Sequence, residues 1–112
     1  MISFNGFSEN CLTFKATAKI DKGVPVCISD NETVKTCAAN DVIIGVAVSG
    51  SDDAVGVQMT GYVELHYSGQ TAPALGYTAL KADGNKGVTA GGSRSYTVVK
   101  VDTVNKVCGF IL

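Results

Sequence analysis

Short runs of alternating apolar and polar residues, each ended by turn-forming residues, recur along the whole chain. The clearest run covers residues 12–20, where Leu12, Phe14 and Ala16 alternate with threonine and lysine. A period of two places one set of side chains against a core and the other in water, as in a β-strand. Glycine, proline and Asp/Asn clusters interrupt the chain too often for a long helix. The sequence therefore predicts an all-β fold.

About nine to ten short strands are expected, with ranges 12–20, 24–28, 33–37, 42–48, 55–59, 62–67, 77–80, 88–90, 96–101 and 107–112. The run 42–48 is almost continuously apolar, which favours a strand buried on both faces. Residues 29–32 also fit a helix capping box, but the two glycines in the matching segment 83–87 disfavour a helix, so we interpret both places as turns. Strands of this number and spacing predict a compact single-domain β-barrel or β-sandwich.

The second half of the chain resembles the first when it is displaced by 53 positions without a gap. Residues 23–59 and 76–112 then share six identities in 37 aligned positions, among them Gly23 with Gly76 and Gly56 with Gly109. The matches fall at turns and in apolar strands, which predicts a weak internal duplication inside one domain. That domain is expected to span residues 12–112, after an N-terminal arm at residues 1–11.

Composition excludes several classes of protein. The chain has 112 residues, of which 46% are hydrophobic and 17% charged, so it is too apolar for a disordered segment. Its net charge of −1 arises without a Lys/Arg cluster, and neither nucleic acid nor a membrane is expected as a partner. The first residues have no basic region followed by a long apolar run, so no signal peptide is expected.

Catalytic and metal-binding patterns are missing from the sequence. His66 is the single histidine, and no nucleophile elbow, zinc motif or phosphate-binding loop accompanies it. Cys11, Cys27, Cys37 and Cys108 lack metal-ligand spacing and are expected to be reduced, partly buried thiols, although their number would permit two disulfides. We therefore expect a non-enzymatic protein with no catalytic residue, cofactor or metal site.

Aromatic residues are the best candidates for an interaction surface. Phe4 and Phe7 precede the first clear strand, where they form either an arm that docks on a neighbour or a local plug. Tyr62, His66 and Tyr67 lie on one strand whose outward face the sequence does not define. These five residues form the predicted protein-interaction surface.

From about residue 11 onward, the order of motifs resembles that of small phage head decoration proteins, also called capsid cement proteins, and of related phage structural proteins. The segments that carry the resemblance are Ala16-Thr17-Ala18, Lys22-Gly23-Val24-Pro25-Val26, Ile44-Gly45-Val46-Ala47-Val48, Gly56-Val57-Gln58-Met59-Thr60-Gly61-Tyr62-Val63, Leu75-Gly76 and Val107-Cys108-Gly109-Phe110-Ile111-Leu112. The resemblance implies a protein that binds the outside of an assembled icosahedral shell and reinforces it, often as a trimer.

This resemblance leads to three expectations. The partner is the major capsid protein, the protein self-associates as a homotrimer, and it resides on the virion surface after assembly in the bacterial host cytoplasm. The alternative is a carbohydrate- or peptide-binding β module of a phage tail or fibre, with Tyr62, His66 and Tyr67 as a stacking surface. A small β-barrel enzyme is disfavoured because the sequence lacks an acid/base constellation.

Overall fold

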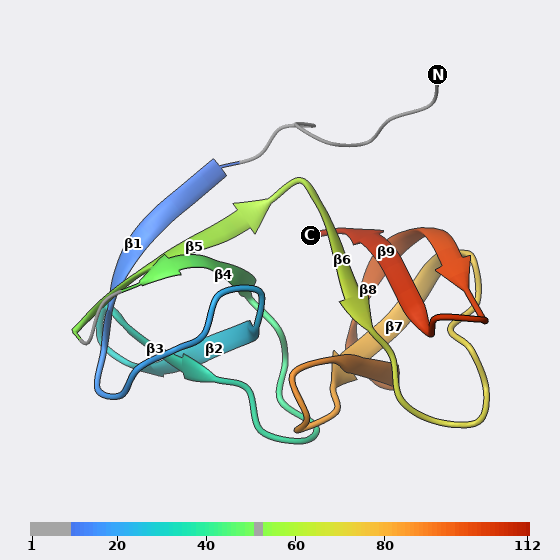
Figure 1. The fold of residues 1–112 in the computed structure, drawn as a ribbon, viewed down its shortest axis with the longest axis horizontal. Helices are drawn as coiled ribbons and strands as arrows, with labels where there is room; N and C mark the ends of the chain where they lie inside the picture. The colour runs from blue at the N-terminus through green and yellow to red at the C-terminus, as the bar shows by residue number, and fades with distance from the viewer. Residues whose placement is uncertain (1–9, 51–52) are drawn as a thin grey trace.

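The computed structural model describes residues 10–50 and 53–112, which form nine β-strands and no helix (Figure 1). The all-β prediction is therefore confirmed for the described part of the chain. The Cα radius of gyration is 13.4 Å, close to the ~13 Å typical of one compact domain of about 100 residues. The predicted arm residues Phe4 and Phe7 lie outside the described residues.

The first five strands close into a barrel in the order β1-β3-β2-β4-β5. Their bounds are β1 (Asn10–Ala16), β2 (Pro25–Asp30), β3 (Thr33–Thr36), β4 (Gly45–Gly50) and β5 (Ala54–Thr60). The barrel closes because β1 pairs antiparallel with β5 on one side and parallel with β3 on the other. Val26, Val34 and Val57 fill its interior.

The last four strands form a separate antiparallel sheet in the order β6-β9-β8-β7. Their bounds are β6 (Tyr62–His66), β7 (Gly76–Ala82), β8 (Val88–Asp102) and β9 (Val107–Ile111). Only Gly61 separates β5 from β6, and its φ of 98° lies in the left-handed region that favours glycine. The chain therefore leaves the barrel and enters the sheet through a one-residue link.

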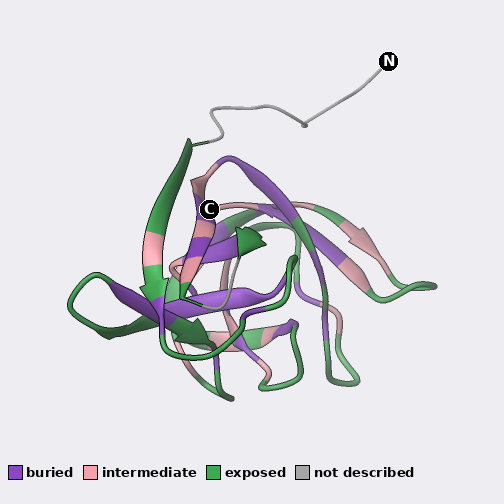
Figure 2. Cartoon of the chain, turned by 60° about the vertical axis from the view of Figure 1, so that its left-hand side comes forward, coloured by how far each residue is buried: buried purple, intermediate pink, exposed green. Residues whose placement is uncertain are grey.

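A second apolar core joins the barrel to the inner face of this sheet. The sheet contributes Leu65, Leu80, Tyr96 and Phe110, all buried, and Ile43 enters the same cluster from the β3–β4 connection. In Figure 2 the buried segments run through the strands, whereas β1 and most of the turns are exposed. Together the two cores account for one domain rather than two independent ones.

Ile43 lies at the junction between the barrel and the sheet. Its side chain is fully buried, and its carbonyl oxygen accepts hydrogen bonds from the Tyr96 hydroxyl at 2.7 Å and from the Arg94 guanidinium at 3.1 Å. The Arg94 guanidinium also lies 4.7 Å from the centre of the Tyr96 ring, which packs edge-on against Phe110. A buried carbonyl outside a β-ladder is satisfied here by side chains.

This junction explains why the expected strand 42–48 is wrong in its bounds. The strand β4 is Gly45–Gly50, and Val42 is 40% exposed, so the segment is not buried on both faces. Residues 42–44 instead cross from the barrel to the second core. Likewise, the expected strand 12–20 is β1 (Asn10–Ala16): it starts inside the predicted arm and ends earlier, while Ile20 is buried from a loop.

Two of the ten expected strands are one strand in the structure. Residues 88–90 and 96–101 belong to β8, which continues through Gly91 and Gly92 at φ values of 112° and 103°. The partner strand β7 pairs with residues 95–98 and then with residues 88–90, so the segment between them bulges out of the ladder. The glycines produce a bend within a strand, not a break between two strands.

The prediction of a turn between β2 and β3 is confirmed, but the turn is limited to Asn31 and Glu32, because β2 continues through Asp30. Strands β2 and β3 pair as an antiparallel hairpin, and Glu32 adopts a left-handed φ of 55° in the tight connection. The capping-box pattern therefore does not open a helix. The Asp30 carboxylate instead accepts a hydrogen bond from the Asn31 backbone N–H at 2.7 Å, which is a local turn contact.

The β4–β5 and β8–β9 hairpins share one irregularity. Val48 is an extra residue beside Gly56 in the first hairpin, and Val99 is an extra residue beside Gly109 in the second. The two glycines are 53 positions apart, whereas the two valines are 51 apart. An ungapped alignment therefore matches β5 with β9 but displaces β4 by two residues relative to β8. The internal duplication itself stays a prediction.

Candidate interaction surface

Tyr67, one of the predicted surface residues, directly follows β6 and continues its inner face. Val63, Leu65 and Tyr67 point into the core, and Tyr67 is only 6% exposed. The alternation predicted for residues 62–67 is therefore present. However, the structure does not offer Tyr67 for stacking against a ligand, because its ring is packed inside the protein.

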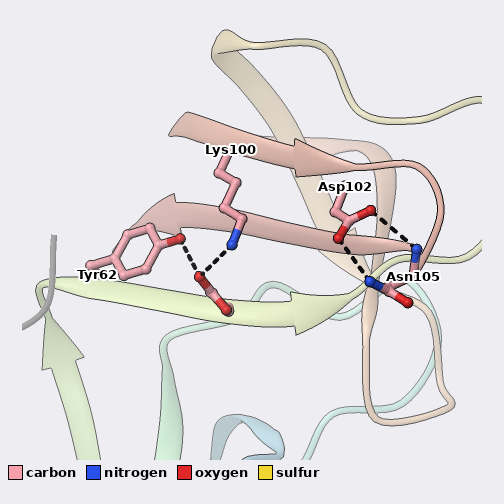
Figure 3. A network of polar contacts seen from close by, with 5 residues as sticks. Tyr62, Lys100, Asp102 and Asn105 are labelled. Carbon is pink, nitrogen blue, oxygen red and sulfur yellow. Dashed lines mark hydrogen bonds and ion pairs between the residues drawn. The ribbon is translucent and has the colours of Figure 1, made fainter. Parts of the chain in front are cut away.

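Tyr62 belongs to the outer face of the sheet, but its ring is also covered. A Cβ atom at Gly109 would overlap the Tyr62 phenol, which shows that the ring lies across this glycine. The Tyr62 hydroxyl donates a 2.6 Å hydrogen bond to the Glu64 carboxylate, and Lys100 lies 3.4 Å from the same oxygen (Figure 3). With 8% of the residue exposed, Tyr62 is a buried support rather than a free stacking platform.

The Tyr62–Glu64–Lys100 network shifts the titration of its members. Burial, followed by the neighbouring Glu64 carboxylate, raises the pKa of the Tyr62 hydroxyl. The hydrogen bond from Tyr62 lowers the pKa of Glu64, and Lys100 lowers it further. At neutral pH, Glu64 is therefore ionised and Tyr62 neutral, which is the pair of states that this hydrogen bond requires.

His66 is the one residue of the predicted Tyr62–His66–Tyr67 surface with an exposed side chain. It lies at the end of β6, on a cavity of about 660 Å³ that the β7–β8 and β8–β9 turns also line. His66 is therefore accessible to a ligand, whereas Tyr62 and Tyr67 are buried. The three residues do not form one stacking surface.

An exposed aromatic residue that the sequence analysis missed lies on the edge strand β7. Tyr77 is 80% exposed, and Leu75, just before the strand, is 67% exposed. Tyr77 stands opposite Thr97, which stands opposite Ile111, so these residues share the outer face of the sheet. The alternation of side chains along the strand could have identified it. Tyr77 and Lys81 are an even number of residues apart and therefore lie on one face of β7, whereas the buried Leu80 lies on the other face.

The outer face of this sheet is mixed in character, with apolar side chains beside charged ones. Glu64, Gly109 and Lys100 form one row across three strands, and His66, Val107 and Asp102 form the next. The Asp102 carboxylate accepts from the Asn105 side chain at 3.0 Å and holds the following turn (Figure 3). We define the candidate interaction surface as Leu75 and Tyr77, with Thr97, Ile111, Glu64 and Lys100 beside them.

The described cysteines offer little nucleophilic chemistry. Cys27, Cys37 and Cys108 are buried, and only Cys11 is exposed. Burial is the main cause that raises the pKa of all three buried thiols, to about 11 for Cys108. Cys27 also donates a 3.4 Å hydrogen bond to the Asp41 carboxylate. Protonated thiols of this kind behave as small apolar side chains.

Within residues 10–50 and 53–112, no group of three His, Cys, Asp or Glu side chains is placed to hold a metal ion. The same part of the chain contains no helix that is long and apolar enough to cross a membrane. A comparison with protein-family models finds no match, and neither does a comparison with curated proteins. A functional proposal therefore depends on the fold, the exposed surface and the motif resemblance.

Proposed function

We propose that this protein is a non-enzymatic virion structural protein of a phage or prophage, which decorates and stabilises the outer surface of the capsid. The observation that carries the proposal is the edge strand β7, where Leu75 and Tyr77 are two of the three most exposed large hydrophobic side chains in the described part of the protein. An exposed apolar patch on a sheet edge is suited to contact with another protein.

The closed barrel supports the proposal in a second way. Its five strands close on themselves, with β1 paired to β5 along most of its length and to β3 at Lys15 and Ala16, so fewer strand edges are open to unwanted pairing than in an open sheet. A protein that coats a shell in many copies needs one adhesive surface and otherwise resistance to aggregation. The closed barrel supplies the resistance to aggregation, and the exposed edge strand β7 supplies the adhesive surface.

The motif resemblance supplies the choice of partner, which is the major capsid protein. In this proposal the protein assembles on heads in the bacterial host cytoplasm and stays on the virion surface as a homotrimer. In the same proposal, Phe4 and Phe7 of the predicted N-terminal arm contact the shell. In this proposal the protein binds the assembled lattice and not free capsid subunits. Binding therefore shifts the assembly equilibrium towards the intact particle.

Co-sedimentation with undecorated heads of the encoding phage or prophage tests the proposal. We expect saturable binding at a fixed copy number per capsid subunit, and sedimentation analysis of the free protein to give a trimer. Absence of binding at protein concentrations far above that of the capsid subunits would overturn the capsid assignment.

Deletion of residues 1–9 tests the role of the arm. The deletion stops before Asn10 because β1 begins there and pairs with β5. We expect the shortened protein to keep its thermal unfolding transition but to lose head binding. A matched control, Phe4→Leu together with Phe7→Leu, keeps the length and apolar character of the arm, and we expect it to retain most of the binding. Full binding by the shortened protein would contradict the arm proposal.

A further inference from the structure

The cavity beside His66 has features of a ligand-binding pocket that the capsid proposal does not use. Its volume is about 660 Å³, within the range of ~300–1,000 Å³ common for small-molecule sites. Three chain segments meet around it: the end of β6 with residues 66–68, the β7–β8 turn with residues 83–86, and the β8–β9 turn with residues 104–106.

Both turns are fixed by an aspartate at or just after the end of the preceding strand. The Asp83 carboxylate accepts from the backbone N–H groups of Asn85 and Gly87 at 2.6 and 3.0 Å, and also from the Ser68 hydroxyl. Asp102 accepts from the backbone N–H groups of Val104 and Asn105 at 3.0 and 3.1 Å. The walls of the pocket are therefore held in place before any ligand arrives, which reduces the entropy cost of binding.

A lysine occupies the same place in each turn. Lys86 and Lys106 have left-handed φ values of 66° and 54°, and each lies within two residues of the start of the next strand. The carbonyl of Lys106 also accepts a 3.0 Å hydrogen bond from the backbone N–H of Tyr67, which ties its turn to β6. Both lysines therefore belong to the lining of one cavity and have a defined backbone conformation.

The lining of the pocket contains two lysines and one acid, and a second carboxylate, Asp102, accepts hydrogen bonds from the lining residues Val104 and Asn105. Lys86, Lys106 and His66 line the pocket, and the one acid in its lining, Asp83, already accepts three hydrogen bonds. Lys86 also pairs at 3.2 Å with Asp21, which is outside the lining. Among the residues that the structure describes, Lys106 has no ion-pair partner. An anionic group entering the pocket would meet these cations next to the neutral amides of Asn85 and Asn105.

We propose that this pocket binds an acidic sugar, whose carboxylate or phosphate group lies between Lys86 and Lys106 and whose hydroxyl groups bond to Asn85 and Asn105. Cations recognise the anion, and amides with both donors and acceptors suit a polyol. Tyr67 is buried and Val104 is the one exposed apolar residue of the lining, so the pocket lacks an apolar subsite for a peptide side chain.

Titration of the ¹⁵N-labelled full chain, followed by amide chemical shifts, tests the proposal with four probes: glucuronate, glucose 6-phosphate, glucose and inorganic phosphate. We expect saturable shifts in segments 66–68, 83–87 and 103–107 with one or both acidic sugars and none with glucose. Glucuronate distinguishes a carboxylate ligand from the phosphate ligand that glucose 6-phosphate represents. Inorganic phosphate is expected to bind more weakly than glucose 6-phosphate, because it lacks the sugar hydroxyls.

Charge-removing variants locate the site. Lys86→Gln and Lys106→Gln should each weaken binding about tenfold or more, since each removes a hydrogen bond to a charged group. Lys19→Gln, an exposed lysine outside the pocket, is the matched control and should leave affinity unchanged. The spectra of the variants without ligand report directly whether they remain folded.

Three results would overturn the proposal. They are the absence of shifts in the three segments with either acidic sugar, binding of glucose as tight as that of the tighter-binding acidic sugar, and unchanged affinity in both lysine variants. Inorganic phosphate binding as tightly as glucose 6-phosphate would overturn the sugar assignment as well. None of these outcomes bears on capsid binding, because the pocket lies apart from Leu75 and Tyr77.

Discussion

At the scale of single residues, the four thiols differ in what surrounds them. Cys11 is exposed on β1, whereas Cys27, Cys37 and Cys108 are buried with raised pKa values. A raised pKa leaves less of the reactive thiolate at a given pH, and burial also blocks access. At about pH 8, we expect N-ethylmaleimide to modify one site rapidly and the other three only after unfolding. Intact-mass spectrometry counts the adducts. Two missing adducts after unfolding would reveal a disulfide and contradict this account.

Gly109 is required because Tyr62 occupies the space that a side chain would fill. We expect Gly109→Ala to lower the free energy of unfolding by about 1–3 kcal/mol, as for other overpacked sites. Urea denaturation measures this change. If the overlap is the cause, adding Tyr62→Ala should make the double variant less destabilised than the sum of the two single variants. Strictly additive changes in the free energy of unfolding would show that Gly109→Ala destabilises the protein for a reason other than overlap with Tyr62.

Glu64 gives the stability of the protein a defined dependence on pH. Its pKa in the folded state lies below the ordinary value of 4.5, chiefly because Tyr62 donates a hydrogen bond to it. The resulting stabilisation is present above that ordinary value and is lost as the pH falls through the lower folded pKa. Glu64→Gln should therefore flatten the acid side of the stability curve, by less than about 1 kcal/mol because the side chain is partly exposed.

Urea unfolding across a pH series measures this slope, with Glu32→Gln in the β2–β3 turn as the control. Some slope should remain in the Glu64 variant, because hydrogen bonds also lower the pKa values of Asp41 and Asp102. A variant whose acid-side slope equals that of the unmodified protein would show that Glu64 contributes nothing to it.

At the scale of the element, strand β7 combines an edge position with an exposed aromatic ring. Tyr77→Ser should change the free energy of unfolding by no more than about 0.5 kcal/mol, because the side chain is exposed. It should nevertheless weaken binding to heads, which co-sedimentation measures. Val104→Ser is the matched control, since Val104 is 89% exposed but belongs to the β8–β9 turn. Equal binding by the Tyr77 variant and the control would remove β7 from the interface.

Elements that alternate in sequence were the most predictable part of this fold. The turn between β2 and β3 and the strands expected at residues 55–59 and 62–67 could be predicted because local turn chemistry and period-two alternation agree. The run 42–48 misled because apolar residues crossing between two cores look the same in sequence as a buried strand. Gly91 and Gly92 led to a wrong prediction of two strands, because glycine is common both in turns between strands and in bulges within a strand.

The candidate surface was less predictable than the strands. Choosing Tyr62 and Tyr67 by residue type failed because aromatic rings serve packing as readily as binding. Tyr67 lies in the core, and Tyr62 covers a glycine on a different strand, Gly109, which no local pattern reveals. Tyr77 could have been found from the parity of β7. The pocket beside His66 is lined by the end of β6 and by two turns. These three segments are distant in sequence and come together only in the folded chain.

At the scale of the whole molecule, the fold divides its work between two parts. The first five strands close into a barrel, and the four-stranded sheet presents the exposed edge strand β7, the mixed outer face and the pocket lined by Lys86 and Lys106. Ile43, Tyr96 and Arg94 fasten the two parts together through one buried carbonyl. A rigid body of this kind can add contacts to a shell without a large cost in conformational entropy.

The most direct test of the central claim is the temperature at which undecorated heads come apart, measured by light scattering with increasing amounts of the protein. The capsid account predicts that this temperature rises with protein concentration and levels off at the copy number found by co-sedimentation, because the protein binds the intact shell and not its dissociated subunits. An unchanged disruption temperature at saturating protein would contradict the claim that it stabilises the capsid.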